Sequence, residues 1–261
     1  MWSRLGWRPN GVRLGRLGIR DWGRTGFGLG DRGIGMTGKV VVMESILGAN
    51  EAVACENRAR LDAAGVFGLN LMASPGAGKT SLIEHTIKGL AGQARLAVID
   101  GDVASSIDAD RAAAAGAMAV QINTGGGCHL DAAMVRQGLE QLALDEVQLL
   151  IVENVGNLIC PANFQLGMHT RVLVASIPEG DDKPYKYPGM YRDVDVLVIN
   201  KTDLLPYIDF DMARFRRGVE ALNPGLVTFP LSCRTGEGMD AWLWWVEVQM
   251  EEMRDAALHS V

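Results

Sequence analysis

Short apolar runs recur along the chain and alternate with stretches that have helical spacing. Runs with so few polar interruptions are typical of strands in a parallel sheet covered on both faces. They lie at residues 66–73, 96–99, 117–120, 149–152, 172–175 and 194–199. Helices are predicted at 106–115, 130–142, 210–222 and 239–254, after a leading helix over 43–65. The alternation predicts a doubly wound α/β domain with a mostly parallel sheet, helices on both faces and ligands at the carboxyl ends of the strands.

The first predicted strand opens into a glycine loop that ends in Lys79 and Thr80. The stretch Ala73-Ser-Pro-Gly-Ala-Gly-Lys-Thr80 follows the P-loop pattern GxxxxGK[ST], with alanine in place of the first glycine. In such a loop the backbone N–H groups cradle phosphates, the lysine reaches the β- and γ-phosphates, and the hydroxyl is offered to magnesium. The fold is therefore expected to be that of a P-loop NTPase. The predicted nucleotide-binding residues here are Gly76, Ala77, Gly78, Lys79, Thr80 and Ser81.

Asn200, Lys201 and Asp203 follow the strand predicted at 194–199 and form the pattern N-K-x-D. A carboxylate at Asp203 can accept from the N1–H and the N2 amine of guanine together, and adenine does not present these donors in that arrangement. The Lys201 stem can lie on the base. Ser232 and Cys233 begin a loop that resembles the one closing over the base in GTPases, with cysteine in place of the usual alanine. We therefore expect the nucleotide to be GTP.

Acidic residues end two further predicted strands. Glu153, with Gly156 three positions later, stands where a magnesium-linked carboxylate and a backbone N–H that senses the γ-phosphate are expected. Asp102 is expected to bind the water shell of the metal or to orient the attacking water, although it also fits an ordinary helix cap. Phosphoryl transfer depends on positioned water, magnesium and positive charge. Lys79, Asp102, Glu153 and Gly156 are the predicted catalytic residues.

Cys128, His129 and Cys160 form a second group of candidate ligands. The first two lie in the glycine-rich stretch Thr124-Gly-Gly-Gly-Cys-His129, and Cys160 follows Glu153 by seven residues. Three ligands are too few for a closed tetrahedral zinc site, so a fourth must come from water, another residue or a second subunit. Thiolate and imidazole suit zinc, nickel or copper, and ligand type does not select among them. The alternative is a buried cysteine pair with an incidental histidine.

Composition and charge exclude several classes of protein. The 261 residues carry a formal net charge of -6, which argues against nucleic-acid binding. No apolar stretch approaches the ~20 residues of a membrane helix, and we expect a cytoplasmic protein without a membrane association. Residues 1–36 hold seven Arg, two Asp and ten Gly. We expect 1–38 to be a disordered extension, or to result from a start codon assigned too early, and 39–261 to be the GTPase domain.

Five motifs in this order resemble the HypB family of hydrogenase nickel-incorporation GTPases. They read Ser74-Pro-Gly-Ala-Gly-Lys-Thr80, Thr124-Gly-Gly-Gly-Cys-His-Leu-Asp131, Glu153-Asn-Val-Gly-Asn-Leu-Ile-Cys-Pro161, Glu179-Gly-Asp-Asp-Lys-Pro184 and Asn200-Lys-Thr-Asp203. The similarity also includes Ile46-Leu-Gly-Ala-Asn50 and Glu56-Asn-Arg58 ahead of the P-loop.

The resemblance implies a slow GTPase that dimerises with nucleotide and helps insert nickel into the large subunit precursor of [NiFe] hydrogenase. It also implies a HypA-type partner, and nickel or zinc bound by Cys128, His129 and Cys160 at the dimer interface. One departure is that residues 1–54 contain neither Cys nor His, so the N-terminal nickel motif of many members is missing.

Two alternative functions remain open from the sequence. The first is a nucleotide-gated interaction module in which zinc only holds a dimer together. The second is a urease-type nickel accessory GTPase, whose loop is expected to read Cys-Pro-His where this chain has Cys128-His129.

Overall fold

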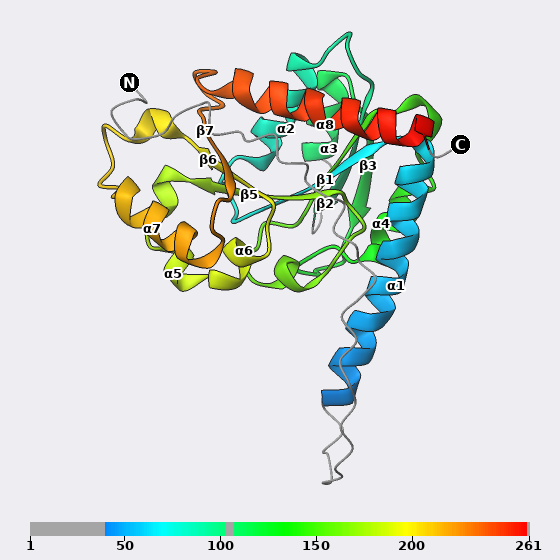
Figure 1. The fold of residues 1–261 in the computed structure, drawn as a ribbon, viewed down its shortest axis with the longest axis horizontal. Helices are drawn as coiled ribbons and strands as arrows, with labels where there is room; N and C mark the ends of the chain where they lie inside the picture. The colour runs from blue at the N-terminus through cyan, green and yellow to red at the C-terminus, as the bar shows by residue number, and fades with distance from the viewer. Residues whose placement is uncertain (1–39, 103–106, 260–261) are drawn as a thin grey trace. The chain divides into compact units, whose positions relative to one another are not determined.

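The chain forms a seven-stranded sheet in the order β3-β2-β4-β1-β5-β6-β7 (Figure 1). The computed structural model describes residues 40–102 and 107–259, with side chains described from residue 46 onward. The extension predicted at 1–38 and the first residue of the helix predicted at 106–115 lie outside these residues. The strands are β1 Phe67–Ala73, β2 Leu96–Asp102, β3 Met118–Asn123, β4 Leu149–Glu153, β5 Thr170–Ser176, β6 Val196–Asn200 and β7 Val227–Pro230.

Every neighbouring pair of strands is parallel. All six apolar runs of the sequence became strands, which confirms the predicted fold class and makes the sheet wholly parallel. β2 continues three residues past its predicted end, through Asp100 and Asp102, because it pairs with β3 along that whole stretch. The two aspartates are therefore part of the sheet edge and do not belong to a loop.

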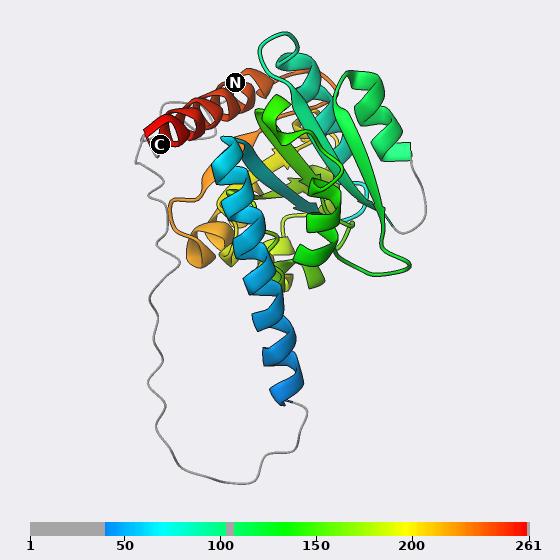
Figure 2. The same ribbon diagram turned by 90° about the vertical axis from the view of Figure 1, so that its right-hand side faces the viewer.

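Helices cover both faces of the sheet. α2 (Lys79–Gly89), α3 (Ile107–Ala115) and α8 (Met239–His259) pack on one face, where Leu82, Ile87 and Trp242 join the buried residues of β1. On the other face the part of α1 (Val40–Ala64) from Ile46 onward runs beside α4 (Ala132–Leu139), and both pack on β2 and β4 (Figures 1 and 2). α7 (Met212–Leu222) follows the short helices α5 (Lys183–Lys186) and α6 (Pro188–Arg192). None of the helices among the described residues combines the length and apolarity needed to span a bilayer.

Several helix ends differ from the sequence prediction for identifiable reasons. α4 begins two residues late because Asp131 caps it by accepting a hydrogen bond from the Met134 N–H at 2.8 Å. α7 likewise begins after Asp211, which accepts from the Arg214 N–H at 2.9 Å. α5 and α6 were not predicted, since helices this short do not complete enough turns to show a period. Both have proline in their first turn, as does the 3₁₀ turn η4 (Cys160–Asn163).

His169 ties α1 to the start of the sheet. Its Nδ1 accepts from the Gly68 N–H at 2.8 Å, so the ring proton is on Nε2, which lies 2.9 Å from Asp62 Oδ1. Burial lowers the pKa of His169 from its usual 6.5, and Asp62 opposes this effect. His169 is therefore a structural residue.

Stability is expected to fall as the pH drops below the ordinary pKa of histidine, in part through His169. The His169 ring binds a second proton less readily in the folded protein than in the unfolded chain. Its contribution to the free energy of unfolding is therefore complete above pH 6.5 and is lost as the pH falls below that value. Urea unfolding at pH 8 and pH 5 measures the difference. A His169→Gln variant should lose less stability than the wild type over this interval. Equal losses of stability in the two proteins would contradict a contribution of His169 to this pH dependence.

Candidate nucleotide and metal site

The predicted nucleotide-binding residues meet at the carboxyl edge of the sheet. The P-loop follows β1, Glu153 ends β4 and Asn200 ends β6. Asp102 ends β2, and Ser232 comes just after β7. Because all strands are parallel, segments far apart in sequence emerge on the same side, where ligands of open α/β sheets bind. The structure brings the P-loop, the acidic strand ends and the N-K-x-D loop together.

The P-loop has the backbone shape expected of a phosphate cradle. Gly76 and Gly78 have φ of 76° and 104°, values that favour glycine. α2 begins at Lys79 without a side-chain cap, and the N–H groups of a first helical turn have no acceptor within the helix. This end of α2 therefore presents N–H donors and the positive end of the helix dipole to an anion.

Asn200 connects the N-K-x-D loop to the P-loop. Its Nδ2 donates to the Ala77 carbonyl at 3.0 Å, and its Oδ1 accepts from the N–H groups of Lys201 and Cys233 at 2.7 and 3.2 Å. A Cβ on Gly78 would lie 2.3 Å from Asn200 Nδ2, so only glycine fits there. Lys201, at a φ of 61°, donates from Nζ to the Gly76 carbonyl at 2.5 Å. The loop that would read the base is thus built onto the loop that would hold the phosphates.

Asp203 is oriented by Ser232, whose hydroxyl donates to Asp203 Oδ1 at 2.7 Å. This contact uses one lone pair of Oδ1, so the carboxylate would still have acceptor positions to offer to the donors of guanine. Cys233, where related loops have alanine, is buried, and burial raises the pKa of its thiol to about 11. The thiol therefore stays protonated and acts as a small apolar side chain.

Lys79, Thr80 and Glu153 form a compact polar group below the P-loop. Thr80 Oγ1 donates to Glu153 Oε1 at 2.9 Å, and Lys79 Nζ lies 4.0 Å from the same oxygen. Burial raises the pKa of Glu153 to about 7, an effect that Lys79 opposes. Asp100 beside it is 2% exposed, its Oδ2 has no hydrogen-bond partner, and burial raises its pKa to about 6.

This donor set fits magnesium, a hard cation that prefers oxygen ligands and would favour the ionised form of both carboxyl groups. Thr80, Glu153 and Asp100 are the residues that would hold it or its water shell. Asp100 is the residue that the sequence reasoning passed over in favour of Asp102, which is only half-buried. The sequence contained a signal for Asp100. Because residues two apart on a strand face the same way, Asp100 points to the same side of the sheet as Asp102.

Gly156 places the segment after β4 against the P-loop. A Cβ at this position would lie 3.2 Å from both the backbone N and the Cα of Pro75. Any larger residue would push the segment away from the loop. The segment that begins at Glu153 and leads to Cys160 is therefore in backbone contact with the nucleotide site.

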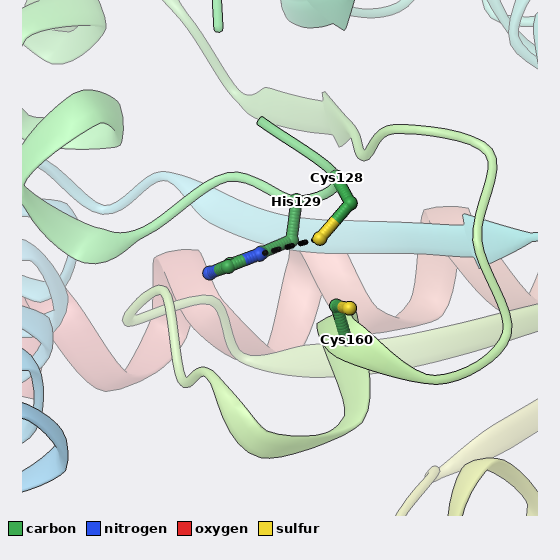
Figure 3. Close-up of side chains that lie close together, drawn as sticks. All are labelled: Cys128, His129 and Cys160. Carbon is green, nitrogen blue, oxygen red and sulfur yellow. Dashed lines mark hydrogen bonds between the residues drawn. The ribbon is translucent and has the colours of Figure 1, made fainter. Parts of the chain in front are cut away.

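Cys128, His129 and Cys160 converge from two loops, as Figure 3 shows. One ligand atom from each lies within 4.8 Å of the other two, and Cys128 Sγ is 3.5 Å from His129 Nδ1. Burial lowers the pKa of His129, which favours the neutral ring that ligates metals. A hydrogen bond with Cys160 raises the pKa of Cys128. The sequence prediction that these three residues lie together is confirmed. Their role as metal ligands remains a prediction.

Two residues that sequence reasoning missed hold this group in place. Asn157 Nδ2 donates to the Cys128 carbonyl at 3.3 Å and so links the two loops. Arg171 donates from its guanidinium to the carbonyls of Ala162 and Pro161, at 2.9 and 3.4 Å, within the turn that begins at Cys160. Arg171 is 8% exposed, and burial lowers its pKa. An arginine at the start of a strand this apolar is the signal that could have identified it.

Comparisons with known proteins agree on one family. Residues 69–230 match the model of the CobW/HypB/UreG nucleotide-binding domain. The chain is 48% identical over 217 residues to a hydrogenase maturation factor HypB of Azotobacter chroococcum, covering 83% of this chain and 71% of the relative. It is 42% identical over 219 residues to a probable hydrogenase maturation factor HypB of Methanocaldococcus jannaschii, covering 84% of this chain and 99% of the relative.

Two solved structures have the same fold. One is a hydrogenase maturation factor HypB from Archaeoglobus fulgidus, with a TM-score of 0.73 and 35% identity, covering 78% of this chain and 99% of that one. The other is HypB from Helicobacter pylori in complex with nickel, with a TM-score of 0.75 and 33% identity, covering 78% of this chain and 96% of that one.

Proposed function

Because the chain belongs to the CobW/HypB/UreG family, and within it to the HypB hydrogenase maturation factors, we propose that it is a GTP-hydrolysing metallochaperone that supports nickel insertion into the large subunit precursor of a [NiFe] hydrogenase. The observation that carries the proposal is the convergence of Cys128, His129 and Cys160 within 4.8 Å, on segments joined to the nucleotide site. The complex of the Helicobacter pylori HypB with nickel supports this cargo.

The nucleotide half of the mechanism follows from the P-loop and its acidic neighbours. The P-loop N–H groups and Lys79 hold the β- and γ-phosphates of GTP, and Asp203 selects guanine. Magnesium, when bound at Thr80, neutralises the phosphate charge that develops during hydrolysis. Asp102 or Asp100 accepts a hydrogen bond from the attacking water and orients it. Lys79 stabilises the transition state because its ammonium is already in place in a site that excludes most water.

The metal half depends on the segment from Glu153 to Cys160. Gly156 lies against Pro75, so the presence or loss of the γ-phosphate moves this segment and, with it, one of the three ligands. Nucleotide state thereby changes the geometry, and hence the affinity, of the nickel site. The coupling is reciprocal, so nickel must change the affinity for nucleotide by the same factor.

Three ligands per chain leave a coordination position for a partner. A second copy of the chain in a nucleotide-dependent homodimer, or a HypA-type metallochaperone, would supply or receive the ion through that position. Cys128 is exposed, which makes such an exchange sterically feasible. The competing function is a zinc ion that only holds a dimer together. It requires a zinc affinity that does not depend on which nucleotide is bound.

Nickel and zinc titrations of the protein loaded with GDP or a non-hydrolysable GTP analogue test the proposal. Thiolate-to-metal absorbance reports binding, and native mass reports the dimer. We expect nickel affinity to differ between the two nucleotides and the dimer to form with the GTP analogue. Tight zinc binding in every nucleotide state, with a dimer lost on chelation, would establish the structural-zinc alternative instead.

The client is tested by delivery of nickel. A relative from Helicobacter pylori, 35% identical over 205 residues, is called a hydrogenase/urease maturation factor. Nickel-loaded protein is therefore offered to a metal-free hydrogenase large subunit precursor and, in parallel, to metal-free urease. Transfer to the hydrogenase precursor is expected, and transfer to urease alone would replace the hydrogenase assignment.

A further inference from the structure

Asn50 on α1 hydrogen-bonds both of the segments that carry the candidate metal ligands. Its Oδ1 accepts from the Ala132 N–H at 2.8 Å, and its Nδ2 donates to the Gln165 carbonyl at 2.8 Å. Ala132 lies three residues beyond His129, and Gln165 lies five residues beyond Cys160. One amide side chain, 9% exposed, therefore joins the two segments.

Asn57 repeats the same connection two helical turns along α1. Its Nδ2 donates to the carbonyls of Ala132 and Leu166 at 2.9 and 3.0 Å, and the residue is 1% exposed. A spacing of seven residues places Asn50 and Asn57 on one face of the helix. Both carboxamides thus bridge the same pair of segments, and both use Ala132 as the point of attachment on the first.

α1 and the second segment also meet backbone to backbone. Gly167 has a φ of 87°, and a Cβ there would lie 2.3 Å from the Ala54 carbonyl oxygen. Arg58 Nε donates to the Gly167 carbonyl at 3.1 Å. Because this contact leaves no space between the two backbones, α1 is held against the second segment. The two asparagines on α1 then set the distance between the two segments that carry the ligands. Separating the segments would leave buried amide and carbonyl groups without partners.

We propose that Asn50 and Asn57 are positioning residues for the metal site, which hold the Cys128–His129 segment and the Cys160 segment at the separation that lets one ion contact all three side chains. The proposal rests on the proposed metal binding, but the distance between the two thiols is a property of the chain itself. It can therefore be measured with or without nickel.

The test uses reduced, metal-free, full-length protein and two probes. Phenylarsine oxide forms two As–S bonds with a pair of adjacent thiols and releases water, so its rate of capture reports how close Cys128 and Cys160 lie. A Cys160→Ala variant gives the background from other thiols. Nickel chloride, followed by thiolate-to-metal absorbance, reports the affinity of the site.

Three variants separate positioning from general destabilisation. Asn50→Leu removes both hydrogen bonds of the side chain. Asn50→Asp keeps the acceptor for the Ala132 N–H and loses the donor to Gln165, so it severs the bridge with a smaller change. Asp62→Asn is the matched control, since it weakens the contact of the same helix with His169 and removes no hydrogen bond to the segment 128–132 or to the segment 160–167. Thermal unfolding ranks the three by stability.

Both Asn50 variants are expected to slow arsenical capture and to weaken nickel binding by about 10-fold, the lower end of the effect of residues that orient metal ligands. Asp62→Asn should change neither quantity, even at a comparable loss of thermal stability. Wild-type capture rates in both Asn50 variants, or an equal loss in Asp62→Asn, would overturn the proposal. If the wild type binds no nickel while the Asn50 variants still slow capture, the positioning role stands and the proposed function fails.

Discussion

Lys79→Ala is expected to lower the rate of GTP hydrolysis by about 10²- to 10³-fold, which is the usual effect of removing one preorganised charge from a developing anion. Lys79 is 9% exposed and lies 4.0 Å from Glu153 Oε1. Its loss removes the ammonium that would meet the β- and γ-phosphates. It also removes the group that lowers the pKa of Glu153, so this carboxyl becomes harder to ionise. Phosphate release in the presence of magnesium measures the effect.

Lys88→Ala provides the matched control for this prediction. Lys88 lies on the same helix, α2, in its last turn, and its side chain is exposed. This variant removes an equal charge at the far end of the helix from the P-loop, so hydrolysis should stay within experimental error of the wild type. A folded Lys79→Ala protein with wild-type turnover would show that hydrolysis does not use this loop.

Cys160→Ala is expected to weaken nickel binding by at least about 100-fold. Even residues that only orient metal ligands typically change affinity by about 10- to 100-fold, and Cys160 would be one of three direct ligands. The change also removes the ligand that lies on the segment in contact with the P-loop, so any difference in nickel affinity between GDP and the GTP analogue should disappear. Nickel titration in both nucleotide states tests the two effects together.

Cys55→Ala is the control for the loss of a thiol. Cys55 is exposed on α1, outside the group formed by Cys128, His129 and Cys160, so its removal should leave nickel affinity unchanged. A Cys160→Ala protein that keeps a nucleotide-dependent nickel affinity would rule out the coupling through the segment from Glu153 to Cys160. Loss of nickel binding in both cysteine variants would show instead that nickel binds thiols without a defined site.

The fold class could be predicted from the sequence because its determinants are local. Five of the six apolar runs are strands buried along nearly their whole length, and the sixth, β3, is a partly buried strand at the end of the sheet. The P-loop and N-K-x-D patterns encode backbone shapes within a few residues. Strand ends and helix starts depend on more distant contacts, since pairing with β3 extends β2 to Asp102 and the Asp131 side chain moves the start of α4 to Ala132. Asp102, chosen from the sequence, and Asp100 both lie at the end of β2, and only the packed structure shows that Asp100 is the more deeply buried of the two.

The sequence by itself determined that a parallel sheet presents a P-loop, an N-K-x-D pattern and two cysteine-bearing loops at one edge. Only the tertiary structure decided how those loops are held together. Asn50 and Asn57 act across at least 75 residues of chain through bonds to backbone groups, and Arg171 supports the turn at Cys160 from inside the sheet. Backbone carbonyls are the same at every position, so no residue pattern marks which of them a distant side chain will meet. That information exists only once the sheet and α1 have packed.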